Sequence, residues 1–218
     1  MQAEVTSIAI DAHRQKVAWN VRHALHRRYL EIFTGLTPLL WAKDRQLYLH
    51  SRRLLSLTIA FSRILDLSDE EIIPIALASY FHDVGKLAID DAVLSKTTAL
   101  TQAEYTILQQ HPAHGANMLS QYASTEAALP LILYHHERWD GKGYPAGLAG
   151  EAIPLGARII AITDAFDAMT SGRPYQARRT SMEAIGELMR CAGTQFDERL
   201  VKLFAVSVGF STLSLAEL

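Results

Sequence analysis

The chain has 218 residues, enough for one domain with a sizeable hydrophobic core and short for two. Hydrophobic residues make up 49% of it, as in folded globular proteins, and a net charge of −2 gives no general attraction to nucleic acid. No signal region begins the chain, no apolar run reaches membrane-spanning length, and the single cysteine excludes an intramolecular disulfide. We therefore expect a cytoplasmic protein without a membrane span and without nucleic-acid binding.

The first segment of the chain, residues 1–36, is rich in basic side chains. No acidic residue lies between Asp11 and Glu31, whereas several Lys and Arg residues do. The segment matches no sensor or receiver pattern. We interpret residues 1–36 as an N-terminal helical segment or linker, and residues 37–218 as the main domain.

Helical periodicity dominates the remaining sequence. Thr37 and Pro38 are typical of an N-cap followed by proline at the first helical position, ahead of an apolar stripe from Leu47 to Ile64. Further helix starts are predicted by the pairs Ser68–Glu71, Thr101–Glu104 and Thr180–Glu183 and by Asp197. Pro74 predicts a kink or a restart, and Gly172, Gly193 and Gly209 predict helix ends. Alternating strand patterns are scarce, so we expect an all-α bundle.

Several histidines and aspartates occupy apolar helices or their ends, where an unpaired polar group is costly. His82 and Asp83 end the apolar segment IIPIALASYFHD, and an aspartate at a helix C-terminus opposes the helix dipole. A bound cation would resolve that conflict. His111 stands at the end of a predicted helix, where Pro112 should force it out of helical geometry. Taken alone, each such residue also has a structural explanation, such as a core histidine satisfied by one hydrogen bond.

Taken together, the candidate ligands exceed what one catalytic ion uses while keeping an open position. The candidates are His50, His82, Asp83, His111, His135, His136 and Asp164. Imidazoles and carboxylates without thiolates suit iron, manganese or zinc. Two ions that share Asp83 are the economical arrangement, and such a pair promotes phosphoryl displacement.

The ordered motifs resemble the HD-GYP subfamily of the HD superfamily, bacterial phosphodiesterases that hydrolyse cyclic di-GMP. The resemblance runs from Leu47 to Phe204 and rests on His50-Ser51, HDVGK, HP, HHE, DGKGYP, ITDAFDAMTS, RPY and AGTQFD. It implies an HD-domain helical bundle over residues 37–218, with a dinuclear iron or manganese site and a long GYP loop. It implies that His50, His82, Asp83 and Asp164 hold one ion, and that Asp83 bridges to a second held by His111, His135 and His136.

The resemblance also implies roles around the metals. Asp83 and Lys86 are the implied catalytic residues, and the implied substrate-binding residues are Lys86, Tyr144, Arg173 and Gln176. Glu137 and Asp140 are expected to fix the loop or to orient imidazoles. We expect Asp167 to be a structural hydrogen-bonding residue.

Two positions depart from the family pattern. Gln46 stands where some members have a glutamate that helps to hold a third ion, so we expect two ions. Gln176 replaces the cation that often follows RPY, which weakens the prediction of affinity for the cyclic dinucleotide.

The leading functional hypothesis is hydrolysis of cyclic di-GMP to pGpG by a metal-bridging hydroxide, with GMP formed if the linear product rebinds. One alternative is a hydrolase of another cyclic dinucleotide or nucleotide phosphoester. Another is a non-catalytic cyclic di-GMP sensor, or a module that docks a GGDEF-type diguanylate cyclase at the GYP loop.

Overall fold

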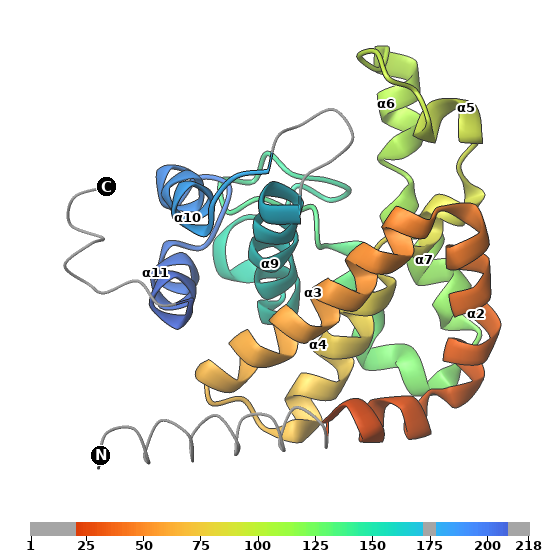
Figure 1. The fold of residues 1–218 in the computed structure, drawn as a ribbon, viewed down its shortest axis with the longest axis horizontal. Helices are drawn as coiled ribbons and strands as arrows, with labels where there is room; N and C mark the ends of the chain where they lie inside the picture. Colours follow the sequence, from red (N-terminus) through yellow and green to blue (C-terminus); the bar gives the residue numbers. More distant parts are fainter. Residues whose placement is uncertain (1–20, 172–177, 209–218) are drawn as a thin grey trace.

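The computed structural model describes residues 21–171 and 178–208, which form a bundle of helices (Figure 1). Within these ranges no β-strand occurs, so the predicted all-α fold is confirmed. Residues 21–28 are helical. The elements that follow are α2 (Leu30–Lys43), α3 (Arg45–Ile64), α4 (Asp69–Phe81), the 3-10 helix η1 (Val84–Ala88), α5 (Asp91–Leu94), α6 (Gln102–Leu108), α7 (His111–Ser120), η2 (Ala123–Ala128), α8 (Leu129–Leu133), η3 (Gly150–Ala152), α9 (Leu155–Ser171), α10 (Ser181–Arg190) and α11 (Glu198–Ser207).

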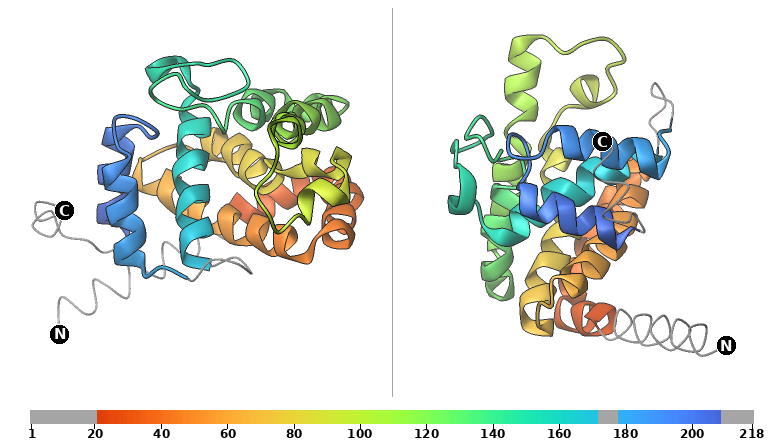
Figure 2. Two further views of the ribbon diagram at one scale, coloured as in Figure 1. Left: turned by 90° about the horizontal axis from the view of Figure 1, so that it is seen from above. Right: turned by 90° about the vertical axis from the view of Figure 1, so that its left-hand side faces the viewer.

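The centre of the bundle is the long helix α3, which packs against α4 and α9. α10 and α11 lie beside α9 on one side, whereas α2, η1 and α7 lie on the other, and α5 and α6 project from the body (Figures 1 and 2). Among the described helices, none has the length and apolarity needed to cross a bilayer.

The predicted helix starts are confirmed at all three capping boxes. In each box the Ser or Thr hydroxyl accepts from the backbone N–H of the glutamate, and the glutamate side chain accepts from the cap residue's N–H. The Asp197 carboxylate likewise accepts from the N–H groups of Arg199 and Leu200 at the start of α11. α4 continues through Pro74 to Phe81 without restarting.

The predicted helix start at Thr37-Pro38 is wrong. α2 begins at Leu30 and contains Pro38, and a separate helix begins after Asp44, whose carboxylate accepts from the N–H of Gln46. Ile32, Leu36 and Leu40 are buried along one side of α2, and this continuous packing outweighs the proline's local cost. The division between residues 1–36 and 37–218 falls inside this helix and stays a prediction.

The expectation for His111 is also wrong in its local structure. α6 ends at Leu108, and His111 is the first residue of α7, with Pro112 next to it. Proline is well tolerated in a first helical turn because its missing N–H has no intrahelical acceptor there. His111 therefore begins a helix instead of ending one.

A close backbone contact joins the HDVGK segment to α7. A Cβ atom at Gly85 would lie 1.9 Å from the His111 carbonyl oxygen and 2.5 Å from the Gly115 nitrogen. Both are backbone atoms that cannot rotate away, so only glycine permits this contact. The contact brings Asp83, two residues earlier, to the first turn of α7.

The GYP loop, residues 138–154, is attached to the AGTQFD segment by backbone hydrogen bonds. The Trp139 N–H donates to Gln195 O at 3.1 Å, and the Asp140 N–H donates to Thr194 O at 2.8 Å. The loop closes on itself where the Gly150 N–H donates to Trp139 O at 3.0 Å. These bonds anchor the long loop at its base and explain the location of the AGTQFD motif.

We predict that Gly85→Ala lowers the free energy of unfolding by about 3 kcal/mol, because the added methyl overlaps the backbone of α7. Gly35→Ala is the matched control. Gly35 is exposed in α2, and a Cβ there would meet nothing closer than 4.0 Å, so that change should stabilise by about 0.5–1 kcal/mol. Urea denaturation measures both. A Gly85→Ala variant as stable as the wild type would contradict the proposed contact.

Candidate metal centre

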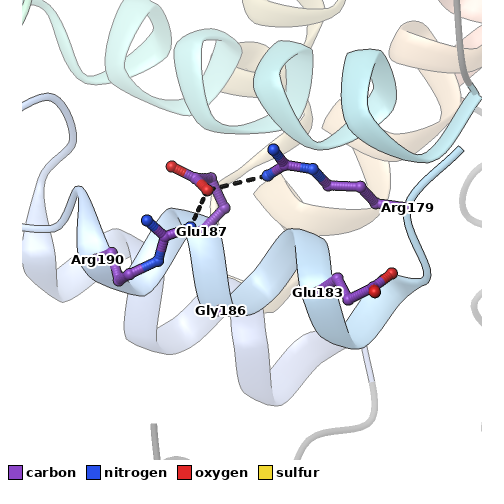
Figure 3. Close-up of a pocket in the computed structure, with 5 residues that line it drawn as sticks. All are labelled: Arg179, Glu183, Gly186, Glu187 and Arg190. Carbon is purple, nitrogen blue, oxygen red and sulfur yellow. Dashed lines mark hydrogen bonds and ion pairs between the residues drawn. The ribbon is translucent and has the colours of Figure 1, made fainter. Parts of the chain in front are cut away.

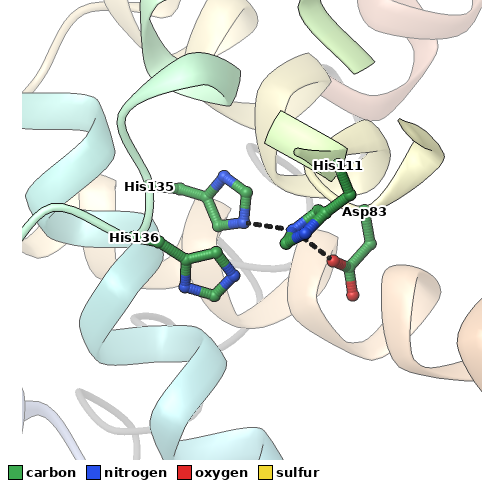
Figure 4. Close-up of side chains that lie close together, drawn as sticks. All are labelled: Asp83, His111, His135 and His136. Atoms are coloured by element: carbon green, nitrogen blue, oxygen red, sulfur yellow. Dashed lines mark hydrogen bonds and ion pairs between the residues drawn. The ribbon is translucent and has the colours of Figure 1, made fainter. Parts of the chain in front are cut away.

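All seven candidate ligands from the sequence lie together in the bundle. His50 projects from α3, His82 and Asp83 follow α4, and Asp164 projects from α9. His111 begins α7, and His135 and His136 follow α8 (Figure 4). The helix ends at α4, α7 and α8 thus supply five of the seven side chains, so the arrangement of these ends determines the geometry of the centre.

The ligand atoms form two groups that share one carboxylate. Asp83, His111, His135 and His136 form the first group, and His50, His82 and Asp83 form the second; within each group the ligand atoms lie within 4.8 Å of one another. Asp164 joins the second group, because its Oδ1 lies 3.1 Å from His50 Nε2. Asp83 is therefore placed where a bridging ligand would be needed.

Hydrogen bonds to Nδ1 orient four of the five imidazoles. Three of them bond the carbonyl oxygen three residues earlier: His82 to Ser79 at 2.9 Å, His111 to Leu108 at 2.7 Å and His135 to Ile132 at 2.6 Å. His50 Nδ1 instead bonds Asp167 Oδ2 at 2.7 Å. Because a carbonyl can only accept, Nδ1 carries the proton in those three rings, and in the neutral imidazole Nε2 presents a lone pair.

These lone pairs face other acceptors. Asp83 Oδ1 lies 3.1 Å from His111 Nε2, and Asp83 Oδ2 lies 3.2 Å from His82 Nε2. His111 Nε2 and His135 Nε2 approach to 3.4 Å (Figure 4). His82 Nε2 and Asp83 Oδ1 are buried and lack a hydrogen-bond partner. The Lys86 ammonium reaches only Asp83 Oδ2, so the remaining converging acceptors fit a cation, which would satisfy them together.

The pKa values of the groups in the centre are shifted in different directions by burial and by neighbouring side chains. Burial lowers the pKa of His136 to about 3 and that of His135 well below its ordinary value, so both rings are neutral, as metal ligands must be. Burial also lowers the pKa of His50, but hydrogen bonds to Asp164 and Asp167 outweigh it and raise that pKa to about 9, so this ring would release a proton on holding an ion. For Asp83, burial raises the pKa, but the surrounding His82, Lys86 and His111 side chains hold it well below the ordinary range.

Comparison with known proteins places this bundle in a family. The family model of the HD domain matches residues 35–200. This chain belongs to the HD domain family. A Pseudomonas aeruginosa protein named cyclic di-GMP phosphodiesterase is 40% identical over 167 residues, which cover 76% of this chain and 40% of that protein. A Vibrio cholerae protein named 3'3'-cGAMP-specific phosphodiesterase 2 is 35% identical over 79% of this chain and 34% of its own length.

A solved structure supports the same fold. The HDG"Y"P protein of Bdellovibrio bacteriovorus superimposes with a TM-score of 0.64 at 16% identity, covering 88% of this chain and 65% of that one. The family resemblance read from the sequence is confirmed. The two named relatives are much longer than this HD domain, which spans less than half of each.

Lys86 lies directly beside the shared carboxylate of the HD domain. Its Nζ donates to Asp83 Oδ2 at 2.6 Å, and 23% of the side chain is exposed. The ammonium group therefore lies at the boundary between the buried ligands and solvent.

Asp167 and Arg53 support His50 from outside the ligand set. Asp167 accepts from His50 Nδ1 and also from Arg53 Nε and Nη2 at 2.8 and 2.9 Å. The structural hydrogen-bonding role expected for Asp167 agrees with these contacts. Sequence reasoning missed Arg53, although its position three residues after His50 places it on the same side of α3.

Glu137 and Asp140 fix the GYP loop and do not orient an imidazole. The Glu137 carboxylate accepts from the backbone N–H groups of Ala146, Gly147 and Leu148 at 2.7, 3.0 and 3.0 Å. Asp140 pairs with Arg138 at 2.8 Å and accepts from the Lys142 N–H. Of the two roles expected for these acids, the contacts match loop fixation.

The remaining sequence candidates fall in three places. Tyr144 lies at the centre, with its ring 4.9 Å from that of His136. Gln46 is exposed on the first turn of α3. Arg173 and Gln176 lie outside the described residues, so their predicted substrate contacts stay predictions.

A hollow on the surface of α10 offers different chemistry (Figure 3). It is lined by Arg179, Glu183, Gly186, Glu187 and Arg190, and Glu187 pairs with both arginines. Because these charges neutralise one another and no histidine contributes, the hollow does not compete with the histidine cluster as a candidate site.

We predict that Asp167→Ala weakens metal binding by about 10–100-fold, because it removes the acceptor that orients His50. Asp69→Ala is the control, since it removes an arginine-paired carboxylate from the exposed start of α4. Chelator competition with manganese measures both affinities. Equal affinities in the wild type and in Asp167→Ala would show that His50 needs no such support.

Proposed function

We propose that this HD domain is a metal-dependent phosphodiesterase that hydrolyses cyclic di-GMP to pGpG, with GMP formed if the linear product rebinds. The observation that carries this proposal is the pair of ligand groups that share the buried Asp83 carboxylate. One group alone would suit a structural ion. Two groups joined by a carboxylate suit phosphoryl transfer, because both the attacking and the leaving oxygen need stabilisation.

The proposed ligand sets follow the two groups. His50, His82, Asp83 and Asp164 would hold one iron or manganese ion, and Asp83, His111, His135 and His136 would hold the other. When bound, such a pair supplies a hydroxide nucleophile at neutral pH and neutralises charge on the phosphoryl group. The exposed position of Gln46 supports a count of two ions, since a neutral amide is a poor ligand.

The chain's own residues perform the remaining tasks. The carbonyl oxygens of Ser79, Leu108 and Ile132 hold three imidazoles with Nε2 toward the centre before any ion arrives. Such preorganisation avoids rearrangement during the reaction. We propose that the partly exposed Lys86 ammonium contacts a nonbridging phosphate oxygen and stabilises its developing charge. Tyr144, Arg173 and Gln176 are the other proposed substrate contacts.

The choice of nucleotide rests on the relatives. The Pseudomonas protein's name favours cyclic di-GMP, and the Vibrio protein's name favours 3'3'-cGAMP as the second candidate substrate. Gln176, in place of a cation, is compatible with either. Turnover of both dinucleotides by one preparation separates the candidates, and a clear preference for 3'3'-cGAMP would overturn the diguanylate assignment.

A non-catalytic role is the remaining alternative. Pro145, Ala146 and Gly147 are exposed at the tip of the GYP loop, which supports docking of a GGDEF-type cyclase. Tight binding of cyclic di-GMP without turnover in metal-loaded protein would favour this role over hydrolysis. A cytoplasmic setting stays a prediction of the sequence.

We predict that Asp83→Ala reduces turnover of cyclic di-GMP by about 10³-fold or more, since it removes the carboxylate shared by both ligand groups. The control is Glu70→Ala, which removes an exposed carboxylate from α4 and should leave the rate unchanged. Chromatography of pGpG and GMP after incubation with iron- or manganese-loaded protein measures the rates. Absence of product from the wild type with either metal, or wild-type turnover by Asp83→Ala, would contradict the proposal.

A further inference from the structure

His136 is held differently from the other four imidazoles of the centre. Those four have Nδ1 hydrogen-bonded to a backbone carbonyl or to Asp167. No described residue makes a hydrogen bond to the His136 ring. A metal-binding histidine ordinarily donates its second ring N–H to a partner that fixes its orientation. Within the described part of the chain, the contacts that confine this imidazole are therefore ring contacts.

The ring of Tyr144 packs against the face of this imidazole. The two ring centroids lie 4.9 Å apart with an interplanar angle of 31°, a tilted contact at a centroid distance typical of aromatic pairs. The same imidazole contacts His135 at 4.0 Å and His111 at 5.0 Å between centroids. His136 is thus confined by rings of the cluster and by one ring from the GYP loop.

Backbone contacts on both sides of Tyr144 fix the main chain that carries its ring. A Cβ atom at Gly143 would lie 2.4 Å from Glu137 Cα and 2.6 Å from the His136 carbonyl oxygen, so the loop lies directly against this backbone. The Tyr144 N–H donates to that same carbonyl oxygen at 3.3 Å. After Pro145, the Glu137 carboxylate holds three successive N–H groups. The loop is therefore fastened to the segment that carries His136.

The hydroxyl of Tyr144 has no such role. It makes no hydrogen bond to a described residue. The interaction with His136 therefore depends on the aromatic ring and not on the oxygen.

We propose that Tyr144 is a positioning residue for the second metal ion and acts by stacking on His136. The GYP loop then forms part of the ion site, in addition to any contact with substrate or partner. Displacement of the loop would release the ion held by His111, His135 and His136 and leave the ion on the side of His50 in place. This inference rests on the proposed two-ion centre.

The test is equilibrium dialysis against graded manganese, with metal per chain measured by mass spectrometry. We expect two ions in the wild type. Tyr144→Ala should weaken the second ion by about 10–100-fold and leave the first unchanged. Tyr144→Phe should match the wild type, because it keeps the ring. Lys142→Ala, an exposed change in the same loop, is the matched control and should also match it.

A double-mutant comparison separates positioning from a general effect on folding. In a His136→Ala background, Tyr144→Ala should cause no further loss of second-ion affinity, because its target is already absent. Additive losses of second-ion affinity in the double mutant would overturn the inference. So would a Tyr144→Ala variant that binds both ions as tightly as the wild type, or one in which the affinities for both ions fall equally. A wild-type protein that binds fewer than two ions would contradict the two-ion centre itself, and the inference with it.

Discussion

The buried carboxylate of Asp83 is the constraint on which the rest of this structure depends. Its two oxygens lie 3.1 and 3.2 Å from imidazole nitrogens, and Lys86 is its nearest cation. An anion in an apolar core is expensive unless positive charge surrounds it. One lysine at the solvent boundary does not satisfy Oδ1, which has no hydrogen-bond partner. The buried Asp83 carboxylate would therefore be stabilised by bound cations.

Helix ends provide the precision that such a site requires. Three histidines follow the same local rule, with Nδ1 bonded to the carbonyl oxygen three residues earlier, so each backbone orients its own ligand. The glycine contact between η1 and α7 then sets the distance between Asp83 and His111. Local hydrogen bonds determine the direction of each imidazole, and close backbone packing determines the distance between Asp83 and His111. Both features are formed by the protein itself without a bound ion.

The sequence predicts the convergent residues well because their chemistry and order are unusual for apolar helices. It also predicts the three capping boxes, since each depends on residues only three positions apart. The sequence-based prediction of helix boundaries is wrong at Pro38 and at His111. Whether a helix continues through a proline depends on how its neighbours, such as Leu36 and Leu40, pack against other helices, and local sequence does not show that packing. The Arg53–Asp167 pair and the stack of Tyr144 on His136 join residues whose spacing gives no signal.

We propose that one carboxylate, that of Asp83, joins two cation sites. A crystal structure of the manganese-loaded protein, with anomalous scattering recorded at the manganese edge, tests it most directly. We expect two anomalous peaks about 3.5–4 Å apart, one on either side of Asp83. A single peak remote from Asp83, or a protein saturated with manganese that shows no peak in the bundle, would contradict it.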